Sequence, residues 1–342
     1  MPNATRARFW TVLLTALGLT LLAAYISLTN GEFDMTIGDV VRTLLRIHPV
    51  RDYDLVIFQF RLPRIVIAAL VGLGLGMAGA VLQGVTRNGL ADPGVLGINA
   101  GAGAAIVLFT FAFAGSGVAG HTGTMAVLAM PLFGLVGGLG TALAIYLFSW
   151  QNGRLNPRLL ILAGIALGMG LSAVSLYVSL RMKPQDFEMA TVWLTGTIWN
   201  ANWLYIVAML PWLVLFVPVV WLRAHRLDLF QLGEDSATSL GLAAEKEKSL
   251  LLLSSIGIVS ACVSVSGNIG FVGLMAPHIA KRLVGIHHSR VLPVCGALGM
   301  LLVVAADFVA RTVFSPVELP VGIVISILGV PYFIFLLFKA RA

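Results

Sequence analysis

The strongest constraint on this chain is a long stretch without formal charge: no Asp, Glu, Lys or Arg lies between Asp92 and Arg154. Over the whole sequence only 11% of the 342 residues are charged, whereas soluble domains carry about 25%. A water-soluble fold could not cover its surface with so few charged side chains. The composition therefore argues against soluble enzymes, nucleic-acid-binding domains and disordered proteins, and it predicts a protein embedded in a lipid bilayer.

Ten transmembrane helices are predicted from the apolar intervals, because one span needs roughly 20 apolar residues. The turn-rich residues 114–123 divide the interval after Asp92 into two spans, and a break over residues 266–277 divides residues 249–281 into a full and a short one. The other six are residues 9–29, 65–86, 159–180, 203–222, 291–310 and 319–338. The predicted fold class is an all-α polytopic membrane protein, with residues 1–342 forming a single transmembrane domain.

Basic residues predict the orientation. An even number of spans places both termini on one side, and with that side inside, fourteen of the 22 Lys and Arg residues lie on inner segments. This agrees with the positive-inside rule, which also explains the net charge of +7 without a nucleic-acid partner. Five of the eight outer basic residues lie between Arg42 and Arg64. That outer cluster needs a separate explanation.

Three segments outside the spans have a predicted structure. Residues 36–47 place Ile37, Val40 and Leu44 at helical spacing, which predicts an amphipathic helix on the outer surface. The centre of the longest inner connection, residues 232–242, predicts a short helix bounded by glycines. The uncharged residues 189–201 include two tryptophans, and we expect them at the membrane interface.

Ionisable and metal-binding side chains are scarce in the predicted spans. Asp307 is their one carboxylate, whereas ion-coupled carriers keep titratable residues along the pathway. No Gly-x-x-x-x-Gly-Lys loop and no His-Glu-x-x-His motif occur, so neither a nucleotide site nor a zinc site is expected. Cys262 and Cys295 lie in apolar runs and fit no disulfide framework. We expect the adjacent His287 and His288 to be solvated rather than metal-binding.

Small residues recur at helical spacing in the predicted spans. Gly-x-x-x-Gly patterns begin at Gly72, Gly134 and Gly164, and they predict close approach of helices. Ser172, Ser175 and Ser179 continue such a row along one helix face. This polar stripe is either the lining of a translocation pathway or a packing surface, and both readings stay open from the sequence.

Several separated motifs resemble one family, the FecCD/BtuC-like permease subunits of ABC importers for iron-siderophores, haem and vitamin B12. The motifs are RLPR (residues 61–64), RNGLADP (87–93), GNIGFVGL (267–274), PHI (277–279), ADFVAR (306–311), ELPVG (318–322) and GVP (329–331). They occur in a consistent order over roughly residues 30 to 340. The resemblance implies a permease without a nucleotide site of its own, in a bacterial cytoplasmic membrane with both termini cytoplasmic.

The same resemblance implies the cargo and the partners. A ferric siderophore is the expected cargo, with haem or vitamin B12 as alternatives within the family. The expected partners are cytoplasmic ABC ATPase subunits, an extracytoplasmic substrate-binding protein and a second permease, identical or paralogous. No cofactor or metal is expected on this chain, because ATP and Mg act through the ATPase. An ion-coupled secondary transporter, or a receptor or scaffold without transport, is the alternative of another class.

Two groups of residues take family roles by resemblance. Arg61, Arg64 and Arg311 match outward-facing arginines that pair with Glu on the binding protein, and membrane-interface anchoring is their alternative role. The inner helix matches the coupling helix that fits a groove on the ATPase, with a plain linker as the alternative. Its residues are Gly233, Glu234, Asp235, Ser236, Ala237, Leu240 and Gly241.

Overall fold

Apolar segments fold into helices here because in a membrane every backbone N–H and C=O group needs a partner within the protein. The computed structural model describes residues 2–30, 35–47, 50–94, 97–113, 124–151, 153–315 and 317–341. Ten helices correspond to the ten predicted spans: α1 (Pro2–Thr29), α4 (Leu62–Thr86), α5 (Ile98–Ala112), α6 (Thr124–Ser149), α7 (Pro157–Ser179), α9 (Trp203–Leu222), α12 (Ala244–Ser266), α13 (Val272–Val284), α14 (His288–Thr312) and α15 (Val321–Arg341).

The lengths of these helices differ. Seven segments of the described chain are long and apolar enough to cross a membrane, whereas α5 and the apolar part of α15 are shorter and α13 has 13 residues. The predicted all-α polytopic fold with about ten helices is confirmed. The turn predicted at residues 114–123 lies outside the described residues.

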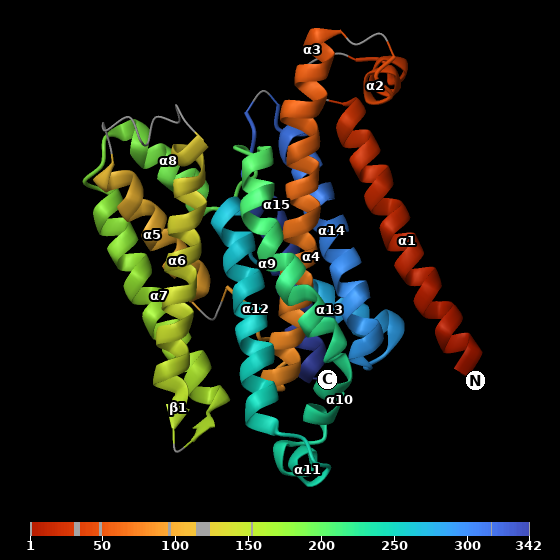
Figure 1. Ribbon diagram of the computed structural model, residues 1–342, viewed down its shortest axis with the longest axis vertical. Coiled ribbons are helices and arrows are strands. Elements are labelled where there is room, and N and C mark those ends of the chain that lie inside the picture. The colour runs from red at the N-terminus through yellow and green to blue at the C-terminus, as the bar shows by residue number, and fades with distance from the viewer. Residues whose placement is uncertain are drawn as a thin grey trace.

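Figure 1 shows how the helices are arranged. Helices α5 to α8 stand on one side of the molecule, α1 stands on the other, and α4, α9, α12, α13, α14 and α15 lie between them. Both termini lie toward the end that carries α11 (Glu234–Ser239), hereafter the α11 end, and α2 (Ile37–Leu44) marks the opposite α2 end.

Helix α4 is the buried centre of the bundle and packs directly on α14. A Cβ added to Gly72 would collide with the carbonyl group of Gly299, and one added to Gly299 would collide with that of Gly72. Gly76 meets the Cys295 carbonyl in the same way. The predicted close approach of helices at Gly72 and Gly76 is therefore confirmed, and Cys295 is a free, buried thiol, as is Cys262.

The second span begins earlier than the sequence predicts. Helix α4 continues a helical rod that starts with α3 (Arg51–Asp54) and a π-helical segment, η1 (Leu55–Arg61). The prediction started the span at residue 65 because Arg61 and Arg64 interrupt the apolar run. Both side chains are held by partners inside the protein, so the helix accommodates them.

Shorter elements decorate the two ends. At the α2 end, Thr36 and Asp39 form a capping box that starts α2, and Val40 is the buried anchor of its apolar face. Of the segment expected at the interface, residues 189–194 form the second half of α8 (Pro184–Leu194), with Trp193 buried, and the rest follows the helix, with Trp199 exposed. At the α11 end lie α10 (Ala224–Gln231) and a two-stranded antiparallel hairpin of β1 (Trp150–Gln151) and β2 (Arg154–Leu155).

Candidate translocation cavity

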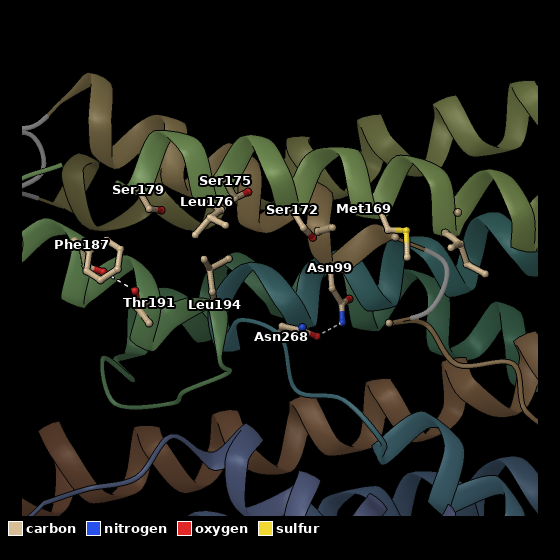
Figure 2. A pocket seen from close by; sticks show the side chains of 16 residues that line it. Asn99, Met169, Ser172, Ser175, Leu176, Ser179, Phe187, Thr191, Leu194 and Asn268 are labelled. Carbon is tan, nitrogen blue, oxygen red and sulfur yellow. Dashed lines mark hydrogen bonds between the residues drawn. The ribbon is translucent and has the colours of Figure 1, made fainter. Parts of the chain in front are cut away.

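A cavity of about 710 Å³ lies between α5, α7 and α8. Its size falls in the range of small-molecule pockets, about 300–1,000 Å³. Six polar side chains line it together with apolar ones: Asn99, Ser172, Ser175, Ser179, Thr191 and Asn268. Within the described chain its lining includes no charged residue. Figure 2 shows the three serines along one side, with Thr191 and Asn268 facing them.

Helix α7 brings its serines to the cavity by its periodicity. The helix starts with Asn156, whose side chain accepts from the backbone N–H groups of Arg158 and Leu159, and with a proline at its first position. From there, 3.6 residues per turn carry all three serines to one face. Ser175 donates to the Leu171 carbonyl at 2.8 Å, and the buried Ser179 hydroxyl has no hydrogen-bond partner within the described residues. The structure brings the serines together at one wall, and their role in translocation stays a prediction.

Three polar residues of the cavity were not among the predicted site residues. Asn99 and Asn268 each follow a glycine with positive φ, Gly97 (φ 74°) and Gly267 (φ 66°), where the chain breaks before a helix. Asn99 Nδ2 donates to Asn268 Oδ1 at 2.5 Å. The third, Thr191, donates to the Phe187 carbonyl within α8. A usable signal was present: an amide side chain one or two residues after a glycine break in an apolar segment.

A second cavity adjoins the first. Its volume is about 680 Å³, and it lies beside α15 and the residues that precede α13. Asn268 and Leu194 line both cavities. These two side chains therefore stand at the boundary between the two spaces.

The predicted short helix of the longest inner connection is confirmed as α11 (Glu234–Ser239). Gly233 (φ 105°) and Gly241 (φ 86°) bound it in conformations that favour glycine. Ala237 is the fully buried residue of this helix, whereas Asp235, Ser236 and Leu240 are exposed. The Glu234 side chain lies outside the described residues.

A cavity of about 550 Å³ lies next to α11 and reaches the hairpin. Lys246 lines it from α12, and Arg154 lines it from the hairpin. The hairpin is fastened to α12, since Glu245 accepts from the Leu155 N–H at 3.0 Å and Lys248, which is fully buried, pairs with Glu245 at 3.1 Å. Charged side chains of the hairpin and of α12, held in place by these contacts, thus lie beside α11.

The three arginines of the α2 end point inward in this structure. Arg61 is buried and donates to the Leu28 carbonyl at 2.5 Å, and Arg311 donates to the backbone and side-chain oxygens of Ser27. Arg64 pairs with Asp307 and with Glu318, each at 2.9 Å. These contacts connect α1, α4 and α14. The arginines are structural partners here, and docking by them stays a prediction.

The expectation for the adjacent histidines is wrong for one of them. His287 is exposed, but His288 is 1% exposed at the start of α14. Asp228 on α10 accepts from the His288 backbone N–H at 2.8 Å and contacts its Nδ1 at 2.7 Å. Burial opposes ionisation of Asp228, but the side-chain and backbone hydrogen bonds from His288, together with the electrostatic interaction with both histidines, outweigh it and lower the pKa of Asp228. The sequence could not show this, because Asp228 lies 60 residues before His288.

The loop that follows α4 contains a buried carboxyl group. Asp92 is 8% exposed, and its Oδ1 accepts from the Gly94 N–H at 2.8 Å. Burial raises the pKa of Asp92 to about 6, although the hydrogen bond from Gly94 acts in the opposite direction. The native loop therefore favours the protonated form of this side chain more than water does.

Comparison with known proteins gives a consistent result. The model of the FecCD transport family matches residues 19–339. The iron-uptake system permease protein FeuC of Bacillus subtilis (strain 168) is 51% identical over 95% of this chain and 96% of its own length. The iron(3+)-hydroxamate import system permease protein FhuG of the same organism is 43% identical over 94% and 95%. A solved structure of a metal-chelate type ABC transporter, in an inward-facing conformation, superposes with a TM-score of 0.80 at 29% identity, covering 96% and 99%.

Proposed function

This chain belongs to the FecCD transport family and is a permease of the ABC-importer type, and from that premise we propose that it carries ferric siderophores across the cytoplasmic membrane. The 710 Å³ cavity between α5, α7 and α8 supports this proposal, because an uncharged lining with hydroxyl and amide groups suits a bulky, oxygen-rich chelate that must bind and leave. The relatives named for iron uptake and iron(3+)-hydroxamate import support the same cargo class.

We place the α11 end on the cytoplasmic side, with both termini there and the α2 end outside. The excess of Lys and Arg on the segments of the α11 end supports this orientation. The match of residues 19–339 to one family model supports a single permease domain over the whole chain.

The energy for uptake comes, in this proposal, from ATPase subunits that dock on α11. The residues from Gly233 to Gly241 form the contact, and Leu240 supplies an exposed apolar side chain for a groove on the partner. Binding and hydrolysis of ATP with Mg in the partner would shift the permease between outward- and inward-facing packings.

A substrate-binding protein delivers the chelate at the α2 end in this proposal. Arg61, Arg64 and Arg311 remain the proposed docking group, and Arg64 is the member whose pairing with Glu318 reaches the surface. Since Arg64 is already neutralised, an acidic side chain of the binding protein would dock by replacing Glu318. Such a contact sets orientation and rate of association more than affinity.

A second permease, identical or paralogous, completes the pathway. Ser175 and Ser179 are buried, but Ser172 and large apolar side chains of α7 such as Met169 and Leu176 are exposed in the single chain and offer a surface for the second permease. Ser172, Ser175 and Ser179 would then line the route between the two permeases.

Reconstituted uptake tests this function. Proteoliposomes holding the permease, its partner permease and the cognate ATPase receive binding protein and a ferric chelate labelled with radioactive iron. We expect uptake to require ATP on the side of the vesicle membrane where α11 and the ATPase lie. Uptake driven by an ion gradient without the ATPase would contradict the proposal, and so would accumulation of haem or vitamin B12 in place of ferric chelates.

A further inference from the structure

The hydrogen bond between Asn99 and Asn268 lies where the two large cavities adjoin. Asn99 lines the 710 Å³ cavity, whereas Asn268 lines both that cavity and the 680 Å³ cavity beside α15. The bond joins the start of α5 to the segment between α12 and α13. The two asparagines are 169 residues apart in the chain. Figure 2 shows both amide groups below the serines of α7.

The backbone around Asn268 is fixed by tight contacts. A Cβ on Gly196 would lie 2.6 Å from the Asn268 carbonyl oxygen, and Gly322 approaches the same oxygen. Hydrogen bonds run from Thr197 N to Ser266 O at 2.8 Å and from Gly322 N to Gly196 O at 2.9 Å. Because these contacts hold the main chain, the side chain is the part of Asn268 that can turn between the cavities.

The two amides leave hydrogen-bonding groups unused. Asn99 is 4% exposed, and in the part of the chain that the structure describes nothing donates to its buried Oδ1. Ser179, in the same cavity, is 3% exposed, and its hydroxyl has no hydrogen-bond partner among those same described residues. Asn268 is exposed, and among the described residues nothing accepts a hydrogen bond from its Nδ2. Buried polar groups without partners are uncommon, and they mark places where a further molecule completes the bonding.

We propose that Asn268 is a cargo-contacting residue, whose amide N–H groups donate to the outer oxygen atoms of a ferric chelate, and that Asn99 positions it between the cavities. This inference rests on the proposed function and names the residue at which the chelate is recognised inside the permease. An amide suits the task because it donates without adding charge to an uncharged cavity, so that binding stays weak enough for release.

Site-directed alkylation tests the contact without relying on transport rate. The native cysteines are fully buried, so Asn268→Cys introduces the reactive thiol that an uncharged maleimide can reach. In the complete complex during ATP turnover, a ferric trihydroxamate or ferric tricatecholate should slow alkylation at least about threefold. Asn200→Cys, on the exposed turn before α9, is the matched control and should show no protection. Equal alkylation of Asn268→Cys with and without the chelate that the wild type imports would overturn the proposal.

Uptake by two further variants tests the chemistry of the amide. Asn268→Leu removes the donors and should lower uptake about two- to tenfold, the value of one or two hydrogen bonds. Asn268→Asp still accepts from Asn99 but repels anionic oxygens, so uptake of a trianionic ferric tricatecholate should fall more than uptake of a neutral ferric trihydroxamate. Wild-type uptake by both variants would overturn the proposal.

The role of Asn99 has its own readout. Asn99→Leu breaks the hydrogen bond but leaves the Asn268 donors in place, so uptake by Asn99→Leu should be slower than by the wild type, whereas adding Asn99→Leu to Asn268→Leu should cause no further loss of uptake. An unchanged rate would overturn the positioning role. If the wild-type complex imports iron chelates while these variants behave as wild type, the inference fails and the proposed function stands. If the wild-type complex imports no ferric chelate, both fail.

Discussion

Arg64 on α4 shares its one Nε–H between the two carboxylate oxygens of Asp307 on α14, at 2.9 and 3.1 Å. Asp307 is 1% exposed, so its charge is balanced inside the protein rather than by water. Glu318 takes the Nη1 side of the same guanidinium and remains partly exposed. One arginine thus serves a buried and a surface carboxylate, and the two pairs differ in what their loss would do.

Removing the buried partner should be strongly destabilising. Asp307→Ala removes the buried partner and leaves Arg64 paired only with the partly exposed Glu318, and we expect a loss of about 3–5 kcal/mol in the free energy of unfolding. Glu318→Ala, the matched change at the exposed partner, should lose less than about 1 kcal/mol. Denaturant unfolding of the detergent-purified protein measures both. Equal losses would show that burial does not distinguish the two pairs.

The contact of α4 with α14 should not tolerate a methyl group. Gly72→Ala or Gly299→Ala places a Cβ against a backbone carbonyl that cannot move aside, and we expect a loss of about 1–3 kcal/mol. Gly140→Ala on α6 is the control, because a Cβ there meets nothing within 4 Å. It should be neutral or stabilising by up to about 1 kcal/mol. Thermal unfolding in detergent compares the three, and an undiminished midpoint for Gly72→Ala would contradict the packing.

An exposed apolar side chain of α11 should matter for coupling rather than folding. Leu240 is 64% exposed, and Leu240→Asp should reduce ATP-driven uptake at least about tenfold while the unfolding midpoint stays unchanged. Ile286→Asp is the control, since Ile286 is 62% exposed at the same end but lies outside α11. Paired measurements of ATP hydrolysis and uptake in proteoliposomes detect the effect. Full coupling in Leu240→Asp would count against docking at α11.

The buried carboxyl group of Asp92 should make stability depend on pH. Its pKa is raised from 3.8 to about 6, so the folded state binds the proton more tightly than the unfolded chain does. The resulting stabilisation is fully present below about pH 4 and is lost as the pH rises through about 6. Asp92→Asn should therefore be more stable than the wild type at pH 8, by up to about 3 kcal/mol, with a much smaller difference at pH 4.5. Unfolding midpoints at the two pH values measure this.

A matched variant isolates the contribution of that one carboxyl group. Asp52→Asn removes an exposed carboxylate on α3 and should leave the difference in midpoint between pH 4.5 and pH 8 as in the wild type. The same gain in Asp52→Asn as in Asp92→Asn would refute the assignment to Asp92.

The helices were predictable where one physical rule governs a whole segment. Apolar length alone located the spans, and the glycines around residues 233–241 located α11, because both signals are local in sequence. The start of α4 was not predictable in this way. Whether Arg61 ends a span depends on Leu28 and on the folded position of α1, which a local window does not contain.

The candidate site was predictable in part for a similar reason. Helical periodicity places Ser172, Ser175 and Ser179 on one face, so their common wall follows from spacing. Asn99 and Asn268 meet only because two distant breaks in the chain adjoin, and no spacing rule links them. The contact between His288 and Asp228 was unpredictable for the same reason, because the two residues are far apart in the sequence.

The contact between Gly72 and Gly299 constrains how the permease can move. Where two helices are in contact backbone to backbone, no side chains lie between them that could rearrange. We therefore expect α4 and α14 to move together as one rigid unit. Helix α7, on the far side of the molecule, makes one close backbone approach, because a Cβ on Gly97 would lie 2.5 Å from the Gly164 carbonyl oxygen, but most of its large side chains face outward. We therefore expect the cavity to open and close by movement of α7 relative to α4 and α14, which move together.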